Sequence, residues 1–121
     1  MRYINLDNYV EIYSETNSLV LINLDLLVNR LKMDSPEYFV DPNTKNVFSL
    51  GRIHSAIKFT KENLGYNNVF EAPKLGIEGN KLGVIDGRHR IAAAKKIGYT
   101  HIYVDIPNKY KEVLFDLTKS N

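Results

Sequence analysis

Apolar residues along this chain gather in short runs that are separated by turn residues and charges. Runs of about four to eight apolar residues bounded by turn signals predict buried strands. The predicted strands are residues 18–23, 72–77, 82–85 and 99–106. The sequence EGNK at residues 78–81 joins the second and third of them into a β-hairpin. A further small hairpin is expected where residues 38–40 and 47–50 flank Asp41-Pro42-Asn43.

Helical spacing of apolar residues predicts helices after Asp7, after Asp25, over residues 51–64, from Arg88 to Gly98, and after Pro107. Asp7 and Asp25 are the expected N-caps of the first two helices, and Gly98 is the expected left-handed C-cap of the fourth. The buried face of the third helix is predicted at Ile53, Ala56, Ile57, Thr60 and Leu64.

Strands and helices in this order predict an α+β fold, a single domain over residues 1–121 in which a mixed sheet packs against helices. Hydrophobic residues make up 44% of the chain, enough for a core at this length. The absence of cysteine excludes disulfides, thiolate metal sites and a thiol nucleophile. No window contains the roughly 18 consecutive apolar residues of a membrane span, so we expect a cytoplasmic protein with no membrane partner.

The most informative motif is VIDGRHRIAAAKK, residues 84–96, where an apolar strand reaches Asp86-Gly87 and an alanine-rich helix begins. The free N–H groups and the positive dipole end of a helix start attract anions. Arg88, His89 and Arg90 add donors there, although cations at this end oppose the dipole at roughly a few tenths of a kcal/mol each. The motif therefore predicts a phosphate site, with Arg90 as its main side-chain donor.

The charge distribution also favours an anionic ligand. Residues 1–49 hold four Lys or Arg against seven Asp or Glu, whereas residues 50–121 hold twelve against seven. In the basic part, Arg52 and Ser55 near the predicted start of the helix at 51–64 are candidate donors to the same anion. The alternative for these two residues, and for Lys95 and Lys96, is a solvent-facing surface.

From residue 19 to residue 106, the order of elements and three segments resemble the ParB/sulfiredoxin superfamily, also called the ParB-like nuclease domain. The segments are NLDLL (23–27), APKLGI (72–77) and IDGRHRIAAAKKIGYTHIYVDI (85–106). The resemblance implies a small α+β fold, followed here by a C-terminal helix over residues 107–121. In this fold the glycine turn and helix start hold nucleotide phosphates or, in some members, contact nucleic acid. Gly87 would be the close-approach glycine, and Arg88, His89 and Arg90 would hold phosphate oxygens.

Stand-alone members with a DGxHR turn include ATP- or ADP-dependent phosphotransferases that act on free serine. In those proteins, carboxylates near the nucleotide serve as base or metal ligand. By resemblance, Asp86 is the matching catalytic residue and Mg²⁺ ligand, and Glu71 is a second catalytic candidate. The implied ligand is ATP or another nucleotide with Mg²⁺, and the implied activity is phosphoryl transfer or nucleotide hydrolysis.

Arg88 departs from two branches of the superfamily. Sulfiredoxin members have a catalytic cysteine at this position, and chromosome-segregation members have a glutamate on which their nucleotide hydrolysis depends. Sulfinic acid reduction is therefore excluded and CTP turnover is not expected. The chain also shows no helix-turn-helix segment for sequence-specific DNA binding.

The alternative function is a small DNA-binding or protein-binding module of plasmid or phage type, without catalysis. In that hypothesis Arg88, Arg90, Lys95 and Lys96 contact backbone phosphates. The sequence shows no carboxylate cluster sufficient for a two-metal nuclease site.

Three roles stay open at the sequence level. Asp86 and Arg90 are either functional groups or a structural pair that holds the turn. His89 is expected to be a phosphate donor rather than a general base, because flanking arginines lower its pKa. Tyr66 and Tyr99, near loops, are candidates for stacking on a nucleobase, with core packing as the alternative.

Overall fold

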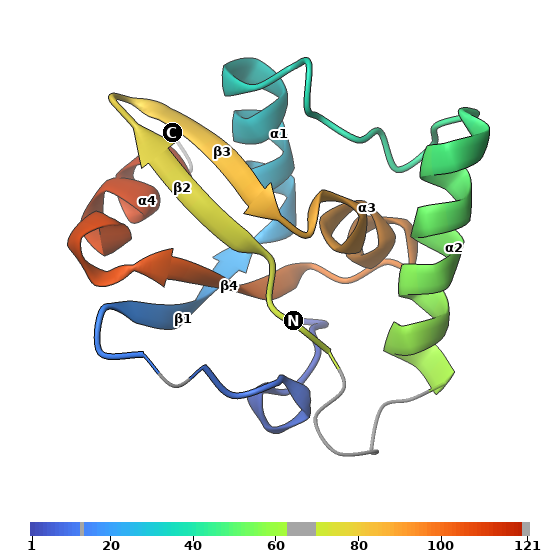
Figure 1. The fold of residues 1–121 in the computed structure, drawn as a ribbon, viewed down its shortest axis with the longest axis horizontal. Coiled ribbons are helices and arrows are strands. Elements are labelled where there is room, and N and C mark those ends of the chain that lie inside the picture. Colours follow the sequence, from blue (N-terminus) through green and yellow to red (C-terminus); the bar gives the residue numbers. More distant parts are fainter. Residues whose placement is uncertain (13, 63–69, 120–121) are drawn as a thin grey trace.

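The computed structural model describes residues 1–12, 14–62 and 70–119, and the side chains of residues 58–62 fall outside the description. The elements are η1 (Leu6–Asn8), β1 (Asn17–Asn23), α1 (Leu24–Asp34), α2 (Val47–Glu62), β2 (Lys74–Glu78), β3 (Lys81–Asp86), α3 (Arg88–Lys96), β4 (His101–Pro107), η2 (Asn108–Tyr110) and α4 (Lys111–Leu117). Four strands form one sheet in the order β1-β4-β2-β3, antiparallel except where β2 lies beside β4 (Figure 1). The mixed sheet and its helices confirm the predicted α+β class.

The main core lies between the sheet and α1, which packs against β1, β3 and α3. α1 buries Leu24, Leu27 and Leu31, whose spacing of three and four residues puts them on one helical face. Leu82 of β3 and Ile102 of β4 are buried in the same core. Each fully buried leucine contributes about 1.5–3 kcal/mol relative to an exposed one. The apolar spacing of α1 therefore fixes it on the sheet.

Residues before the first strand join this core through Tyr9. The Tyr9 ring packs edge-on against Phe70 and Tyr103, with ring centroids 5.0 and 5.4 Å away. Its hydroxyl oxygen accepts a hydrogen bond from the N–H of Tyr103 at 3.1 Å, and burial raises the pKa of this hydroxyl. The segment is thereby attached to β4 and to the chain that leads into β2.

The N-caps of the first two helical elements differ from the prediction. Asn5 caps a single 3-10 turn, η1, by accepting from the N–H of Asp7 at 3.2 Å, so Asp7 is not the cap. Asn23 caps α1 by accepting from the N–H of Leu26 at 3.0 Å, and Asp25 stands in the first turn. In both places an asparagine two residues earlier supplies the side-chain oxygen, and the aspartate adds negative charge near the positive helix end. Tyr13, which the helix predicted after Asp7 would include, lies outside the described residues.

The hairpin predicted over residues 38–50 is wrong. Asp41 does make a turn, since its side chain accepts from the N–H of Asn43 at 2.8 Å. Residues 47–50, however, form the first turn of α2, four residues before the predicted start of that helix. Asn46 provides the cap by accepting from the N–H of Ser49 at 3.1 Å. A short apolar run is compatible with strand or helix, and here the cap decides.

The hairpin of β2 and β3 and the helix after Gly87 are confirmed, and so is Gly98 as the end of α3. Gly98 has φ +90°, and its N–H donates to the carbonyl of Lys95 at 3.1 Å. The next N–H, of Tyr99, donates to the carbonyl of Ala94 at 3.1 Å, which completes a Schellman motif. Toward the C-terminus, Pro107 ends β4 and is also the N-cap residue of η2, and the predicted helix, α4, follows from Lys111 with Leu114 buried.

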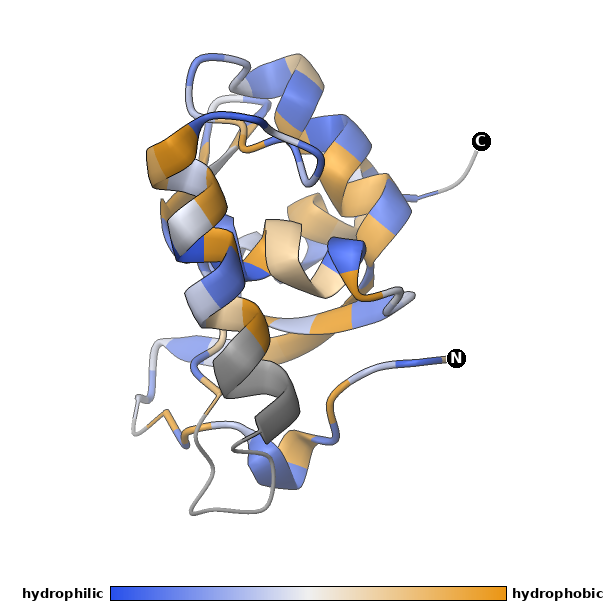
Figure 2. Ribbon diagram, turned by 90° about the vertical axis from the view of Figure 1, so that its right-hand side faces the viewer, coloured by the Kyte–Doolittle hydropathy of each residue, from blue (hydrophilic) through white to orange (hydrophobic). Residues whose placement is uncertain are grey.

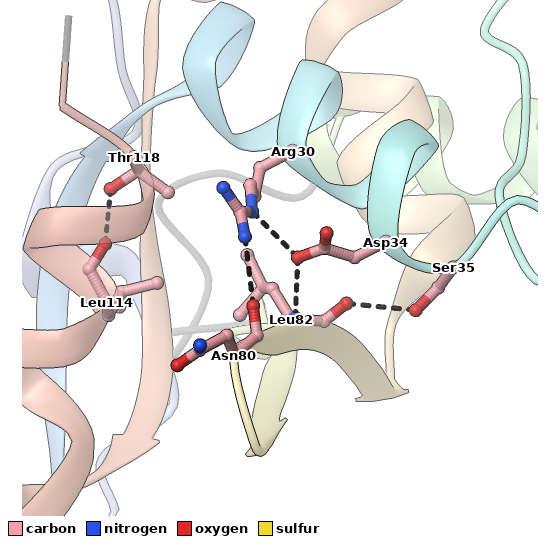
Figure 3. Close-up of polar contacts among 7 residues, drawn as sticks. All are labelled: Arg30, Asp34, Ser35, Asn80, Leu82, Leu114 and Thr118. Carbon is pink, nitrogen blue, oxygen red and sulfur yellow. Dashed lines mark hydrogen bonds and ion pairs between the residues drawn. The ribbon is translucent and has the colours of Figure 1, made fainter.

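The end of α1 covers the outer edge of β3 at Leu82 (Figure 3). The Asp34 carboxylate accepts from the N–H of Leu82 at 2.8 Å and from Nε of Arg30 at 2.7 Å. Ser35 Oγ donates to the carbonyl of Leu82 at 2.9 Å, and Arg30 Nη2 donates to the carbonyl of Asn80 at 2.9 Å. These bonds satisfy backbone groups of β3 and its turn that have no neighbouring strand. They hold the strand that leads to Asp86.

We expect Asp34→Ala to lower the free energy of unfolding by about 2 kcal/mol, because it leaves a buried N–H and Arg30 without their acceptor. The Asp34 side chain is only 7% exposed. Urea unfolding measures the effect. Asp116→Ala is the matched control, since Asp116 is exposed and meets Lys119 only at 4.0 Å; it should leave stability unchanged. Equal stability of the two variants would contradict the role of Asp34.

Candidate functional site

The predicted glycine turn forms where β3 ends and α3 begins. Gly87 has φ +100° and is the N-cap residue of α3, with no side-chain cap. The first turn of α3 contains no acidic residue, and Arg88, His89 and Arg90 occupy it. The N–H groups of a first helical turn have no partner within the helix. This end of α3 therefore combines uncapped N–H groups with three cationic or ionisable side chains.

These residues line an open pocket of about 710 Å³, which we call the turn pocket. Its other walls come from the loop after α1, from α2, from the chain before β2 and from the end of β3. The lining residues are Tyr38, Arg52, Ala56, Phe70, Glu71, Val84, Ile85, Asp86, Gly87, Arg88, His89 and Arg90. Every predicted catalytic or phosphate-binding residue of a nucleotide site is among them except Ser55, which is exposed elsewhere on α2.

Gly87 is required by the protein itself. A Cβ on Gly87 would lie 2.8 Å from Arg90 Nη2 and 2.9 Å from Pro73 Cα, and its φ is one that other residues rarely adopt. The close approach that the resemblance assigned to a ligand is made here by Pro73 and by the Arg90 guanidinium. The turn thus brings the start of β2 and the start of α3 into contact.

Arg90 lies between two carboxylates of the turn pocket. Its Nη2 is 3.4 Å from Asp86 Oδ2 and 4.0 Å from Glu71 Oε2. The Arg90 side chain is 24% exposed, whereas Asp86 and Glu71 are 58% and 63% exposed. Arg90 Nε is buried and has no hydrogen-bond partner among the described residues. Arg90 therefore has a buried donor that these contacts leave unsatisfied.

Arg52 reaches the turn pocket from α2, although not for the predicted reason. Because α2 begins at Val47, Arg52 lies in its second turn and not near its N-terminus. α2 packs on α3 through Ile53, which is buried against Ala92 and Ala93 (Figure 2 shows the two helices from the α2 side). Side chains as small as alanine let the helices approach closely. The alanine run of α3 therefore positions Arg52.

The pKa of His89 is lowered from its ordinary value near 6.5 by partial burial first, then by the charges of Arg88 and Arg52. The prediction that flanking arginines lower this pKa is confirmed for Arg88. Partial burial and the charge of Arg52 also lower it, and neither cause was predicted from the sequence. A lowered pKa favours the neutral ring, which carries one N–H donor.

The predicted Mg²⁺ site depends on which carboxylates lie together in the turn pocket. Within the described residues, no group of three or more His, Cys, Asp or Glu side chains could hold a metal ion. Mg²⁺ is commonly held by one or two carboxylates together with phosphate oxygens and water. Asp86 and Glu71 are the turn-pocket carboxylates available for that mode, and both also lie within 4.0 Å of Arg90 Nη2.

Three other predicted binding residues have partners elsewhere or lie outside the described residues. Lys95 pairs with Asp25 of α1, and Tyr99 packs under the Arg2 guanidinium at 5.8 Å. Tyr66 lies outside the described residues. The sequence missed the apolar part of the turn pocket, chiefly Tyr38 and Ile85. Strand alternation could have indicated Ile85, since the neighbouring Val84 faces the core.

Comparisons of the chain with protein-family models, with curated proteins and with solved structures each find no match. No helix within the described residues is both long and apolar enough to cross a membrane. The fold and the candidate site together define an α+β domain with a pocket at the glycine turn between a strand and a helix. Arginines, two carboxylates and apolar side chains line this pocket.

We expect Gly87→Ala to destabilise the protein by more than about 1 kcal/mol, because it strains the backbone and displaces Pro73 or Arg90. Gly51→Ala is the control: Gly51 lies in α2, and nothing lies within 4 Å of a Cβ added there. That change should stabilise by about 0.5–1 kcal/mol. Thermal unfolding of both variants tests this, and a neutral Gly87→Ala would refute the packing argument.

We expect an NMR titration of the His89 ring to give a midpoint below 6.5. The folded state favours the neutral ring, so the pKa of His89 is lower in the folded than in the unfolded chain. Between these two pKa values the unfolded chain binds more protons, and the stability of the fold therefore falls as the pH drops through that range. Arg88→Gln should raise the midpoint without restoring the ordinary value, because burial is the first cause. Lys96→Gln, the same charge loss at the far end of α3, should leave it unmoved.

Proposed function

We propose that this protein is a ParB/sulfiredoxin-like domain that binds the phosphates of a nucleotide, ATP with Mg²⁺, in the turn pocket. The observation that supports the proposal is the uncapped start of α3, which opens into a pocket that also contains Arg52, Arg88, His89 and Arg90. Uncapped N–H groups and guanidinium forks are the donors that phosphate oxygens accept from most strongly. Cations at the positive end of a helix are unfavourable alone, and a bound phosphate offsets them.

The proposed activity is phosphoryl transfer or nucleotide hydrolysis. Asp86 lies beside Arg90 and is exposed to the pocket, so its carboxylate can accept the proton of an acceptor hydroxyl or of an attacking water. Glu71 is the second carboxylate at the same place. In the other role open to it, Asp86 would instead hold a Mg²⁺ ion, which would neutralise charge on the phosphates. The arginines position the phosphate and balance its charge.

DNA binding by the same basic turn is the competing hypothesis, and the Lys95–Asp25 ion pair weighs against it. Of the four cations that it needs, Lys95 is paired with Asp25 of α1. The other three, Arg88, Arg90 and Lys96, are few for backbone binding, which relies on many phosphate contacts.

The test is thermal unfolding with ATP, ADP, CTP and GTP, each with and without Mg²⁺. A nucleotide at about 100 times its dissociation constant should add roughly 2.7 kcal/mol of stability. Arg90→Ala and Arg52→Ala should remove most of this stabilisation, whereas Asp86→Asn should keep binding and abolish turnover. Lys96→Gln is the matched control, because it removes a charge from α3 outside the turn pocket.

Unchanged turnover in Asp86→Asn would remove its catalytic role and leave the binding site standing. If no nucleotide stabilises the protein and duplex DNA binds with a log–log salt slope of roughly −2 or steeper, the DNA hypothesis replaces this one.

A further inference from the structure

The turn pocket has an apolar part that phosphate binding does not use. Tyr38 comes from the loop between α1 and α2, and Val84 and Ile85 come from the end of β3. Tyr38 and Ile85 are large side chains that are 63% and 72% exposed. A single exposed apolar residue needs no explanation, but two in one pocket beside a cluster of cations mark a binding surface.

The position of Ile85 is defined by the sheet beneath it. Its Cδ1 would lie 3.2 Å from a Cβ on Gly76, so the side chain occupies space that a larger residue on β2 would take. Gly76 pairs with Gly83 across the hairpin, and neither offers a side chain that could cover Ile85. The hairpin therefore holds Ile85 against its own backbone and leaves the outer side of this residue open.

We propose that Tyr38 and Ile85 bind the base of the nucleotide whose phosphates lie at the start of α3. The inference rests on the proposed function and names the part of the ligand that fills the rest of the turn pocket. A ligand that fills both parts needs an anionic group joined to a flat apolar body, and nucleotides have this composition. The volume of about 710 Å³ is in the range of small-molecule sites.

Stacking on a tyrosine ring is available to every base, because every base has a π face. Tyr38 and Ile85 therefore give affinity for a base and little choice among bases, except that a purine covers more apolar area than a pyrimidine. Purine nucleotides should consequently bind more tightly than pyrimidine nucleotides. This assigns to Tyr38 the stacking role for which Tyr66 and Tyr99 were the candidates in the sequence.

Calorimetric titration of the protein with ATP and with inorganic tripolyphosphate, both with Mg²⁺, tests the assignment. ATP should bind more tightly than tripolyphosphate to the wild type. Tyr38→Ala should weaken ATP binding about tenfold, the effect of removing one stacking ring, and leave tripolyphosphate binding unchanged. Tyr38→Phe should retain ATP affinity. Phe48→Ala is the control, because Phe48 is also an exposed aromatic residue, lies on α2 and does not line the turn pocket.

The other outcomes separate the two proposals. Equal affinity of ATP and tripolyphosphate, with no effect of Tyr38→Ala on either, overturns the base site and leaves the phosphate site intact. Equal weakening of both ligands by Tyr38→Ala also overturns it, because Tyr38 would then act on the fold of the pocket. If neither ligand binds the wild type, the proposed function fails and this inference fails with it.

Discussion

The contact of Gly87 with Pro73 is the constraint on which the site depends. The missing side chain of Gly87 lets the start of α3 lie against the residue before β2, with a positive φ that only glycine adopts readily. The carbonyl of Pro73 also accepts from the N–H of Asp105 in β4 at 2.8 Å. One turn therefore joins β2, β3, β4 and α3. Glu71, two residues before Pro73, is brought beside Arg90 as a result.

α3 connects this turn to the rest of the molecule through two different surfaces. Ile91 and Ala94 belong to the main core, whereas Ala92 and Ala93 form a separate buried cluster with Ile53 of α2. The short side chains leave α2 close enough for Arg52 to line the turn pocket. At its far end α3 is stabilised by Lys95, Lys96 and the Gly98 cap, while its start carries cations that oppose the dipole. The unfavourable charges are thus confined to the pocket end.

The sequence predicted most of what local chemistry determines. The β2–β3 hairpin, the Gly87 turn and the end of α3 depend on glycines and on apolar runs within a few residues, and all three were correct. Residues 47–50 were assigned to a strand because a four-residue segment with three apolar residues has no distinguishable period. Residues 86–90, which the sequence motif places together, all line the turn pocket. Tyr38 was missed because its place depends on how the loop after α1 crosses the fold, which no local pattern encodes.

The strengths of the contacts that Arg90 makes with the neighbouring carboxylates bear on its two possible roles. The sequence left open a structural pair with Asp86 or a phosphate donor, and the structure contains the pair at 3.4 Å. Asp86 and Glu71 are more than half exposed, and ion pairs with exposed carboxylates contribute about 0–1 kcal/mol. Hydrogen bonds to a charged phosphate contribute about 1.5–3 kcal/mol. The pairing with Asp86 is therefore weak enough to exchange for phosphate, and the two roles are compatible in one side chain.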